Sequence, residues 1–172
     1  MSNINVIEGD RASTPFEKIP VVVVLDRLRS AHNVGNILRL ADAIHAEKVI
    51  CGGYTACPPH QKLTKASMGT EEIVETEHFE HAAEAAREYK SRGYEVVGVD
   101  TVEGSESIWE IKFKKPLMLI FGNEALGIQE ETLKECHRFV SLPSFGLKNS
   151  INVSNCASVV LYKAAEQFRN NE

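Results

Sequence analysis

Short apolar runs alternate with helical patterns along this chain, and that alternation limits its fold more than any other feature. The run at 21–25, "VVVVL", is β-branched and continuous, which is typical of a strand buried on both faces. Further strands are predicted at 48–52, 71–76, 94–100, 116–122 and 139–143. Helical patterns occur at 33–46, 79–93, 129–137 and 153–168, with a short helix or loop at 60–70. This order predicts an α/β fold, with a parallel sheet flanked by helices.

Length and composition indicate one globular domain that follows a short arm. The chain has 172 residues, of which 43% are hydrophobic and 25% are charged, and this suits a single core. Residues 1–18 are polar and unpatterned, which predicts an N-terminal arm, and 19–172 are predicted to form one domain. The N-terminus lacks a secretory signal pattern, and the apolar runs are too short to span a membrane. We therefore expect a soluble, cytoplasmic protein without membrane contact.

The cysteine pattern favours free thiols over a metal site. Four cysteines occur, and no two of them form a C-x-x-C pair. Cys51, Cys57 and His60 lie close in sequence, but their spacing fits no zinc template and no second half-site follows. We expect reduced cysteines, as in the cytosol, and no metal.

Three loops that follow predicted strands are rich in glycine, asparagine and serine. They span 26–35, 122–128 and 143–155. Ligands of parallel sheets bind at the carboxyl ends of the strands, so these loops are predicted to form a site together. Their glycine spacing matches neither the dinucleotide fingerprint nor the P-loop.

The first loop allows two interpretations. On a helix that Asn33 caps, Gly35 and Arg39 share a face, and the glycine would leave open space above the guanidinium. An arginine near a helix start suits phosphate binding. Alternatively, Arg39 lies on the surface and pairs with Asp42, three residues further on.

The other two loops also allow a structural or a functional interpretation, and in the third loop a polar cluster at a strand end favours a site. Gly122 and Gly127 either form a plain strand-to-helix turn or let backbone amides approach a small molecule. Ser150, Asn152 and Ser154 offer more hydrogen-bonding groups than one helix start requires. They either fill a crevice or line a site.

Three segments together resemble a known family. "NVGNILR", "LIFGNEALGI" and "LPSFGLKNSINVSNCASVVLY" are similar, in order and spacing, to the three motifs of SpoU/TrmH-type RNA 2′-O-ribose methyltransferases, members of the SPOUT superfamily. The resemblance covers about 21–168, nearly the whole chain. It implies a C-terminal deep trefoil knot, S-adenosylmethionine (AdoMet) as the methyl donor, and a homodimer with the active site beside the interface.

The resemblance also implies roles for individual residues. The implied catalytic residues are Arg39, Asn33, Glu124, Ser150 and Asn152. The implied cofactor-binding residues are Gly122, Asn123, Gly127, Leu142, Ile151 and Thr101. Local positive charge for RNA would come from Arg27, Arg29, Arg39 and Lys148. Whether Arg39 acts as a base or as a phosphate clamp stays open, because a guanidinium is normally never deprotonated.

The implied reaction is attack of a ribose 2′-oxygen on the sulfonium methyl, and the substrate is expected to be structured RNA. The net charge of −5 argues against a broadly basic surface, so RNA affinity would depend on local patches. Without a full separate RNA-binding domain, we expect tRNA, with ribosomal RNA as the alternative. Two rivals are a catalytically silent AdoMet- or RNA-binding protein of the same fold and a flavodoxin-like binding or signalling module.

Overall fold

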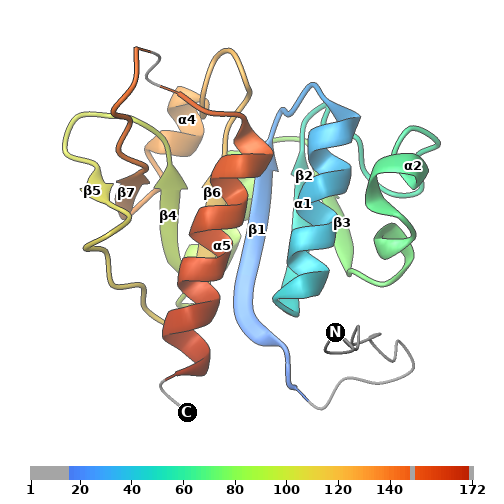
Figure 1. Cartoon of the computed structure of the whole chain (residues 1–172), viewed down its shortest axis with the longest axis horizontal. Coiled ribbons are helices and arrows are strands. Elements are labelled where there is room, and N and C mark those ends of the chain that lie inside the picture. Colours follow the sequence, from blue (N-terminus) through green and yellow to red (C-terminus); the bar gives the residue numbers. More distant parts are fainter. Residues whose placement is uncertain (1–15, 148–149, 171–172) are drawn as a thin grey trace, which may run out of the picture.

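The computed structural model describes residues 16–147 and 150–170, and within them all strands form one parallel sheet (Figure 1). The order of the seven strands is β3-β2-β1-β6-β4-β7-β5. Their bounds are β1 (Ile19–Asp26), β2 (Ala46–Gly52), β3 (Thr76–Phe79), β4 (Glu95–Val99), β5 (Glu106–Ser107), β6 (Leu117–Phe121) and β7 (Arg138–Ser141). The predicted α/β class with a parallel sheet is confirmed.

Helices cover both faces of this sheet. They are α1 (Ala31–Ala43), α2 (Thr64–Ser67), the 3₁₀ turn η1 (Thr70–Glu72), α3 (Ala82–Ser91), α4 (Glu130–Leu133) and α5 (Val153–Arg169). Figure 1 shows α1 and α5 side by side in front of the sheet. Side chains of α3 and α4 pack into a separate hydrophobic cluster on the opposite face.

Strand β1 lies inside the sheet, between β2 and β6, and this position explains why its sequence is continuously apolar. Val21, Val23 and Leu25 pack toward α1 and α5, whereas Val22 and Val24 pack into the cluster with α3. All five are 0% exposed, because successive side chains of a strand point to opposite faces and both faces are covered.

The strand order also fixes where a site can form. From β1 the chain continues outward through β2 and β3, whereas β6, β4, β7 and β5 lie on the other side of β1. The loops after β1 and β6 therefore meet where the direction of winding changes. Such switch points are the usual ligand sites of open parallel sheets.

Helix α5 covers the helical pattern predicted at 153–168, whose apolar residues recur on one face, and Val153 at its start is half-buried. Ala157, Val160, Leu161, Ala164 and Phe168 are all buried, and they pack into the same cluster as α1. A stripe of apolar residues at helical spacing has this outcome when one face of a helix covers a sheet.

Two predictions near β3 were wrong. The segment 71–76 was predicted as a strand, but η1 occupies its start and β3 begins only at Thr76. Ile73, which made the segment look strand-like, is 63% exposed. Phe79 was assigned to the following helix, yet it pairs with Gly52 in the sheet and α3 begins at Ala82. The two-residue strand β5 was not predicted, because it is too short to show alternation.

The bounds of α1 differ from the prediction at both ends. Ser30, not Asn33, is the N-cap, and its hydroxyl accepts a hydrogen bond from the Asn33 N–H at 3.2 Å. The helix ends at Ala43, and Ala46 already belongs to β2. Asn33 thus lies inside the helix, where its side chain is available for other contacts.

Other expectations concern the termini, the thiols and the membrane. Most of the predicted arm, 1–15, lies outside the described residues, and β1 begins at Ile19. All four cysteines are free thiols. Among the helices in the described parts of the chain, none combines the length and apolar character needed to cross a bilayer.

Candidate active site

A cavity of about 570 Å³ opens at the carboxyl edge of the sheet, between the loops after β4, β6 and β7 and the start of α5. Predicted site residues that line it are Thr101, Gly122, Asn123, Glu124, Gly127, Leu142, Ser150 and Ile151. Its volume lies within the ~300–1,000 Å³ typical of small-molecule sites. The structure therefore brings together all of the predicted cofactor-binding residues.

The charged side chains that line the cavity are all acidic among the described residues. Its lining includes the carboxylates of Asp100 and Glu124, and none of the described lining residues is lysine, arginine or histidine. An acidic cavity without basic side chains favours a cationic ligand and disfavours a phosphate. RNA phosphates are therefore expected to bind at the rim and not inside.

The loop after β6 closes on itself, and this explains its glycines. Asn123 and Gly127 exchange two backbone hydrogen bonds of 2.9 Å. A Cβ on Gly122 would lie 2.2 Å from the backbone of Gly127 and Ile128, so no side chain fits there. Gly127 has a φ of +71°. The glycines are thus required by the turn itself, and the loop brings its backbone to the cavity wall.

Asn123 supports this loop with its whole amide group. Its side-chain oxygen accepts hydrogen bonds from the N–H groups of Ala125 (2.9 Å) and Leu126 (3.0 Å). Its Nδ2 donates to the carbonyl of Arg27 (2.8 Å) and to the hydroxyl of Tyr54 (2.9 Å). Since an asparagine amide has about four such positions, this side chain shapes the cavity and has no group left for a ligand.

Asp100 joins the loop after β4 to the loop after β6. Its Oδ1 accepts from the Thr101 N–H at 2.7 Å, and its Oδ2 accepts from the Ile128 N–H at 3.0 Å. Each oxygen keeps one further acceptor position. Thr101, implied by the resemblance to bind the cofactor, and its neighbour Asp100 are therefore part of the cavity wall.

Glu124 binds the start of α1. Its Oε2 accepts from the backbone N–H of Arg29 (3.0 Å), and its Oε1 accepts from the N–H of Ser30 (3.2 Å). Oε1 also accepts from Asn33 Nδ2 at 2.9 Å. Partial burial raises the pKa of Glu124, but these donors outweigh it and the pKa lies below its usual value.

A hydrogen-bond chain continues from Glu124 into the third motif. Asn152 Nδ2 donates to Asn33 Oδ1 at 3.1 Å. Asn152 is the N-cap of α5, and its Oδ1 accepts from the backbone N–H (2.9 Å) and the hydroxyl (2.7 Å) of Ser154. This series of hydrogen bonds runs from Glu124 through Asn33 and Asn152 to Ser154, and we call it the amide chain. It connects all three motifs.

The amide chain corrects two details of the sequence interpretation. The start of α1, predicted to bind phosphate, instead binds the Glu124 carboxylate, which the helix dipole also favours. The predicted open space at Gly35 is filled by α2, since a Cβ there would lie 2.5 Å from the Cβ of Ala66. Gly35 is a packing residue and not part of an anion site.

Arg39 lies away from the cavity. It is exposed on α1, and among the described residues it does not line the cavity or pair with Asp42. The side chain of Asn152, implied to be catalytic by the resemblance, contacts Asn33 and not Arg39. Of the other predicted RNA-binding residues, Arg29 is exposed, Arg27 is half-buried, and Lys148 lies outside the described residues.

Sequence reasoning missed two aromatic residues at this edge. Trp109 lines the cavity and is 64% exposed, but it follows the short strand β5, which has no detectable pattern. Tyr54 bonds Asn123 from the loop after β2. The glycines of "CGGYTA" at the end of a predicted strand were the signal available for Tyr54.

Comparison with known proteins agrees with this geometry. The model of the SpoU rRNA Methylase family matches residues 20–162. The chain belongs to this family. The family resemblance inferred from the three motifs is thereby confirmed.

Individual SpoU relatives show what this chain is similar to. The 23S rRNA (guanosine-2′-O-)-methyltransferase RlmB of Ralstonia nicotianae is 32% identical over 152 residues, which cover 88% of this chain and 61% of the relative. The chain spans about three-fifths of the length of the first such relatives.

Solved SpoU structures share the fold. AviRb of Streptomyces viridochromogenes, in complex with AdoMet, superposes with a TM-score of 0.79 at 28% identity, covering 92% of this chain and 64% of AviRb. A protein studied for the 2-OH methylation of C/U34 on tRNA gives a TM-score of 0.77 at 25% identity, covering 87% of this chain and 97% of that protein.

Proposed function

We propose that this SpoU protein is an AdoMet-dependent RNA methyltransferase that places a methyl group on a ribose 2′-oxygen. The observation that carries the proposal is the acidic cavity built from the second and third family motifs and joined to the first by the amide chain. Family membership and the similarity to AdoMet-bound AviRb support it.

The residues of the cavity fit AdoMet. Its sulfonium is a cation, and the nearby charged side chains, Asp100 and Glu124, are anions. Leu142 and Ile151 supply apolar surface for an adenine ring, and the loop at Gly122 lines the cavity, where its backbone groups would bond the cofactor. Bound there, AdoMet would supply an activated methyl group.

The protein's own contribution would be positioning. With three donors on its carboxylate and a lowered pKa, Glu124 is a poor proton acceptor, so we assign it to holding the loops. Asn33 and Asn152 act through the same chain, and Ser150 stands at the cavity where substrate would enter. Holding two reactants in line accounts for much of the rate in such reactions.

Arg39 is assigned to binding an RNA phosphate. Its guanidinium stays charged at neutral pH and is exposed, which suits a clamp better than a base. Because Arg39 does not line the described cavity of its own chain, a direct role in transfer requires that it act beside the cavity of a second copy.

A homodimer would meet that requirement. Val159 and Tyr162 on α5 are 37% and 54% exposed, and Ile151 beside the cavity is 53% exposed. These apolar side chains favour an interface next to the site. Ala157 on α5 is 0% exposed and lies in the core, so it is not part of such an interface. We retain the homodimer and the C-terminal trefoil knot as proposals.

The proposed substrate is tRNA, with ribosomal RNA as the alternative. Support for tRNA comes from the protein that this chain covers to 97% and that was studied for methylation of tRNA. RlmB, whose name specifies 23S rRNA, supports the alternative. We propose that the protein acts in the cytoplasm, where both RNAs occur.

Methylation of RNA in vitro tests the proposal. Wild-type protein is incubated with AdoMet and either bulk tRNA or ribosomal RNA, and nucleosides are analysed by mass spectrometry after digestion. The expected product is a 2′-O-methylated nucleoside from tRNA that is lost with Arg39→Ala, while AdoMet affinity is retained. A base-methylated nucleoside would overturn the reaction, and product from ribosomal RNA alone would overturn the substrate.

AdoMet binding without transfer to any RNA would favour the catalytically silent alternative. Absence of AdoMet binding would favour a binding or signalling module of another kind. Calorimetry distinguishes these two outcomes before any RNA is added.

A further inference from the structure

Tyr54 lies next to Asn123 of the cavity wall, in an unusual setting. It is 53% exposed, yet its hydroxyl accepts a 2.9 Å hydrogen bond from Asn123, which lines the cavity. An exposed tyrosine on a loop is normally free to change rotamer. Here the hydroxyl at the far end of the ring is held by a hydrogen bond to the cavity wall.

The guanidinium of Arg27 lies over the ring of Tyr54, with its carbon 5.0 Å from the ring centroid. Arg27 Nη1 donates to Gln129 Oε1 at 2.9 Å, and the Asn123 amide holds the Arg27 carbonyl. The backbone of Arg27 has a φ of +58°, which non-glycine residues adopt only when surrounding contacts enforce it.

The loop that carries Tyr54 is equally well fixed. Thr55 is 4% exposed, and its hydroxyl accepts from the Leu28 N–H at 2.9 Å and lies within 3.0 Å of the Leu25 carbonyl. Gly53 has a φ of +60°, and a Cβ there would lie 2.9 Å from the Cγ of Arg27. The arginine stem therefore packs against the glycine, and the Arg27–Tyr54 pair is held in place before any ligand binds.

A purely structural brace would explain the hydroxyl contact but not the exposure of the ring. The pair presents an aromatic surface and a fixed positive charge outside a cavity that is itself acidic. Among the described contacts, one of the five guanidinium N–H groups is used, by Gln129. Exposed Arg29, two residues further on, adds a second cation on the same loop.

We propose that Tyr54 and Arg27 form a preformed platform for the RNA substrate, on which a nucleobase next to the methylated nucleotide stacks. Unpaired bases are commonly recognised by stacking on aromatic rings and guanidinium planes, and free N–H groups of arginine bind the adjacent phosphate. The platform would place RNA at the rim while AdoMet occupies the cavity. This inference rests on the proposed function, because it names residues that bind the substrate of that reaction.

Binding of fluorescently labelled bulk tRNA tests the platform independently of catalysis. Tyr54→Ala is expected to weaken binding about tenfold, within the range found when a stacked aromatic is removed. Tyr54→Phe keeps the ring and loses only the hydroxyl, so binding should stay within about twofold of wild type. If Tyr54→Ala does not fold, Tyr54→Leu, which keeps apolar bulk without an aromatic face, replaces it.

The salt dependence separates the charge of Arg27 from its packing. Arg27→Gln is expected to reduce the slope of log Kd against log salt by about one, as for the loss of one phosphate contact. Arg87→Gln is the matched control, since Arg87 is exposed on α3 and pairs with Glu135. That control should leave the slope unchanged, and an equal change in both variants would overturn the assignment of Arg27.

The outcomes also separate this inference from the proposed function. Unchanged tRNA binding by Tyr54→Ala, equal losses in Tyr54→Ala and Tyr54→Phe, or absence of tRNA binding by wild type would each overturn the platform. Tyr54→Ala should in addition raise the KM for tRNA more than it lowers kcat. If wild type binds tRNA through Tyr54 but transfers no methyl group, the platform stands and the enzymatic proposal fails.

Discussion

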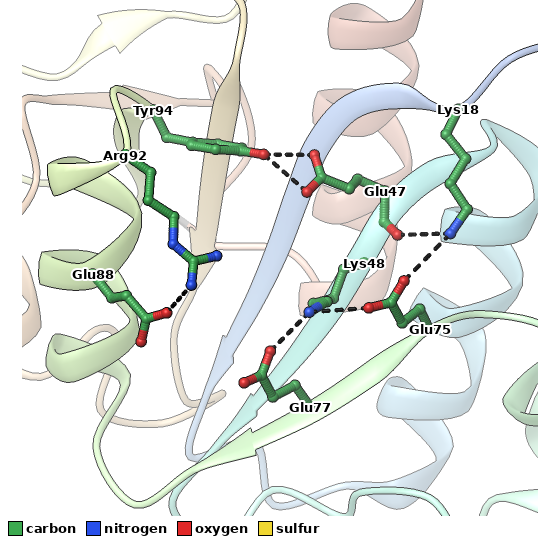
Figure 2. A network of polar contacts seen from close by, with 8 residues as sticks. All are labelled: Lys18, Glu47, Lys48, Glu75, Glu77, Glu88, Arg92 and Tyr94. Atoms are coloured by element: carbon green, nitrogen blue, oxygen red, sulfur yellow. Dashed lines mark hydrogen bonds and ion pairs between the residues drawn. The ribbon is translucent and has the colours of Figure 1, made fainter.

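The two edges of the sheet are held together by different kinds of polar contact. At the amino edge, Figure 2 shows charged side chains in a surface network, in which Lys48 contacts Glu75 at 3.0 Å and Glu77 at 2.9 Å. At the carboxyl edge, the amide chain joins one carboxylate to two asparagines, of which Asn152 caps α5, and to Ser154. Both networks link segments that are distant in sequence, and one member of the second, Glu124, lines the cavity.

The amino-edge network extends beyond Lys48 to the starts of other strands. Lys18 Nζ lies 3.6 Å from Glu75, and the Tyr94 hydroxyl donates to the Glu47 carboxylate at 2.7–2.8 Å. Glu75 and Glu77 have side chains that are 56% and 42% exposed. Exposed pairs of this kind contribute about 0–1 kcal/mol each, because water screens them.

The difference shows that the loops at the site are positioned by specific hydrogen-bond pairing and not by the number of charges. In the amide chain, each donor has one acceptor and each asparagine is held at both ends, so the relative positions of three loops are specified. In the amino-edge network, either carboxylate near Lys48 can replace the other. We therefore expect mutations at the two edges to differ in both stability and activity.

The largest effect is expected for Glu124→Gln. The variant loses the charge on three hydrogen bonds and turns an amide N–H toward other donors, so we expect a loss of about 2 kcal/mol in unfolding free energy. Methyl transfer should fall by about 100-fold, because the loops after β1 and β6 separate. Glu77→Gln is the matched control at the amino edge, with an expected loss of at most ~0.5 kcal/mol in chemical denaturation.

Equal losses in these two variants would show that the edges do not differ. The unfolding free energy and the methyl-transfer rate are measured on the same preparations. A variant that is only less stable would lose both in proportion. Wild-type stability in Glu124→Gln would show that the hydrogen bonds of the Glu124 carboxylate do not hold these loops together.

A smaller effect is expected for Asn152, which combines a cap with a bridge to Asn33. Asn152→Ala removes both functions, and we expect a loss of about 1 kcal/mol, typical of an N-cap, with about tenfold weaker AdoMet binding and transfer. Asn152→Asp keeps a good capping residue but lacks the Nδ2 donor. It should retain most of the stability and still lose activity; full activity in Asn152→Asp would make the bridge dispensable.

Much of the fold follows from sequence, because its signals are local. The run at 21–25 predicted a doubly covered strand, and the stripe on α5 predicted the buried face. The glycines at 122 and 127 marked a special turn, although its cause is close backbone contact and not a ligand. These patterns depend on neighbouring residues alone.

The polar pairing could not be predicted, because it joins distant residues. Glu124 and Asn33 are 91 positions apart, and Asn33 and Asn152 are 119 apart. From the sequence, Asn33 looked like a helix cap because an asparagine near a helix start usually is one. Only the packing of α1 against α5 turns it toward both partners.

The pH dependence of stability provides a third, weaker contrast. The pKa of Glu124 is lower in the folded protein than its usual value, so its stabilisation is present above the unfolded pKa. It is lost as the pH falls through the lowered, folded pKa. Wild type should therefore lose more unfolding free energy than Glu124→Gln between pH 7 and about 3, measured by urea denaturation. Parallel pH curves for the two proteins would contradict the assignment.

The smallest effect is expected at Lys48. Lys48→Met keeps most of the buried stem and removes both ion pairs, so we expect a loss below about 1 kcal/mol. The difference from wild type should shrink in 1 M salt, where the Debye length is about 3 Å. A salt-independent loss above that value would show that the amino edge is as specific as the carboxyl edge.

Direct titration with AdoMet tests the central claim that the cavity at the carboxyl edge is a cofactor site. Trp109 is the only tryptophan in the chain and lines this cavity, so its fluorescence reports on ligand entry while calorimetry gives the stoichiometry. We expect saturable binding of one AdoMet per chain with a change in Trp109 emission, and weaker binding by Glu124→Gln than by Glu77→Gln. Failure of both AdoMet and S-adenosylhomocysteine to bind at millimolar concentration would contradict it.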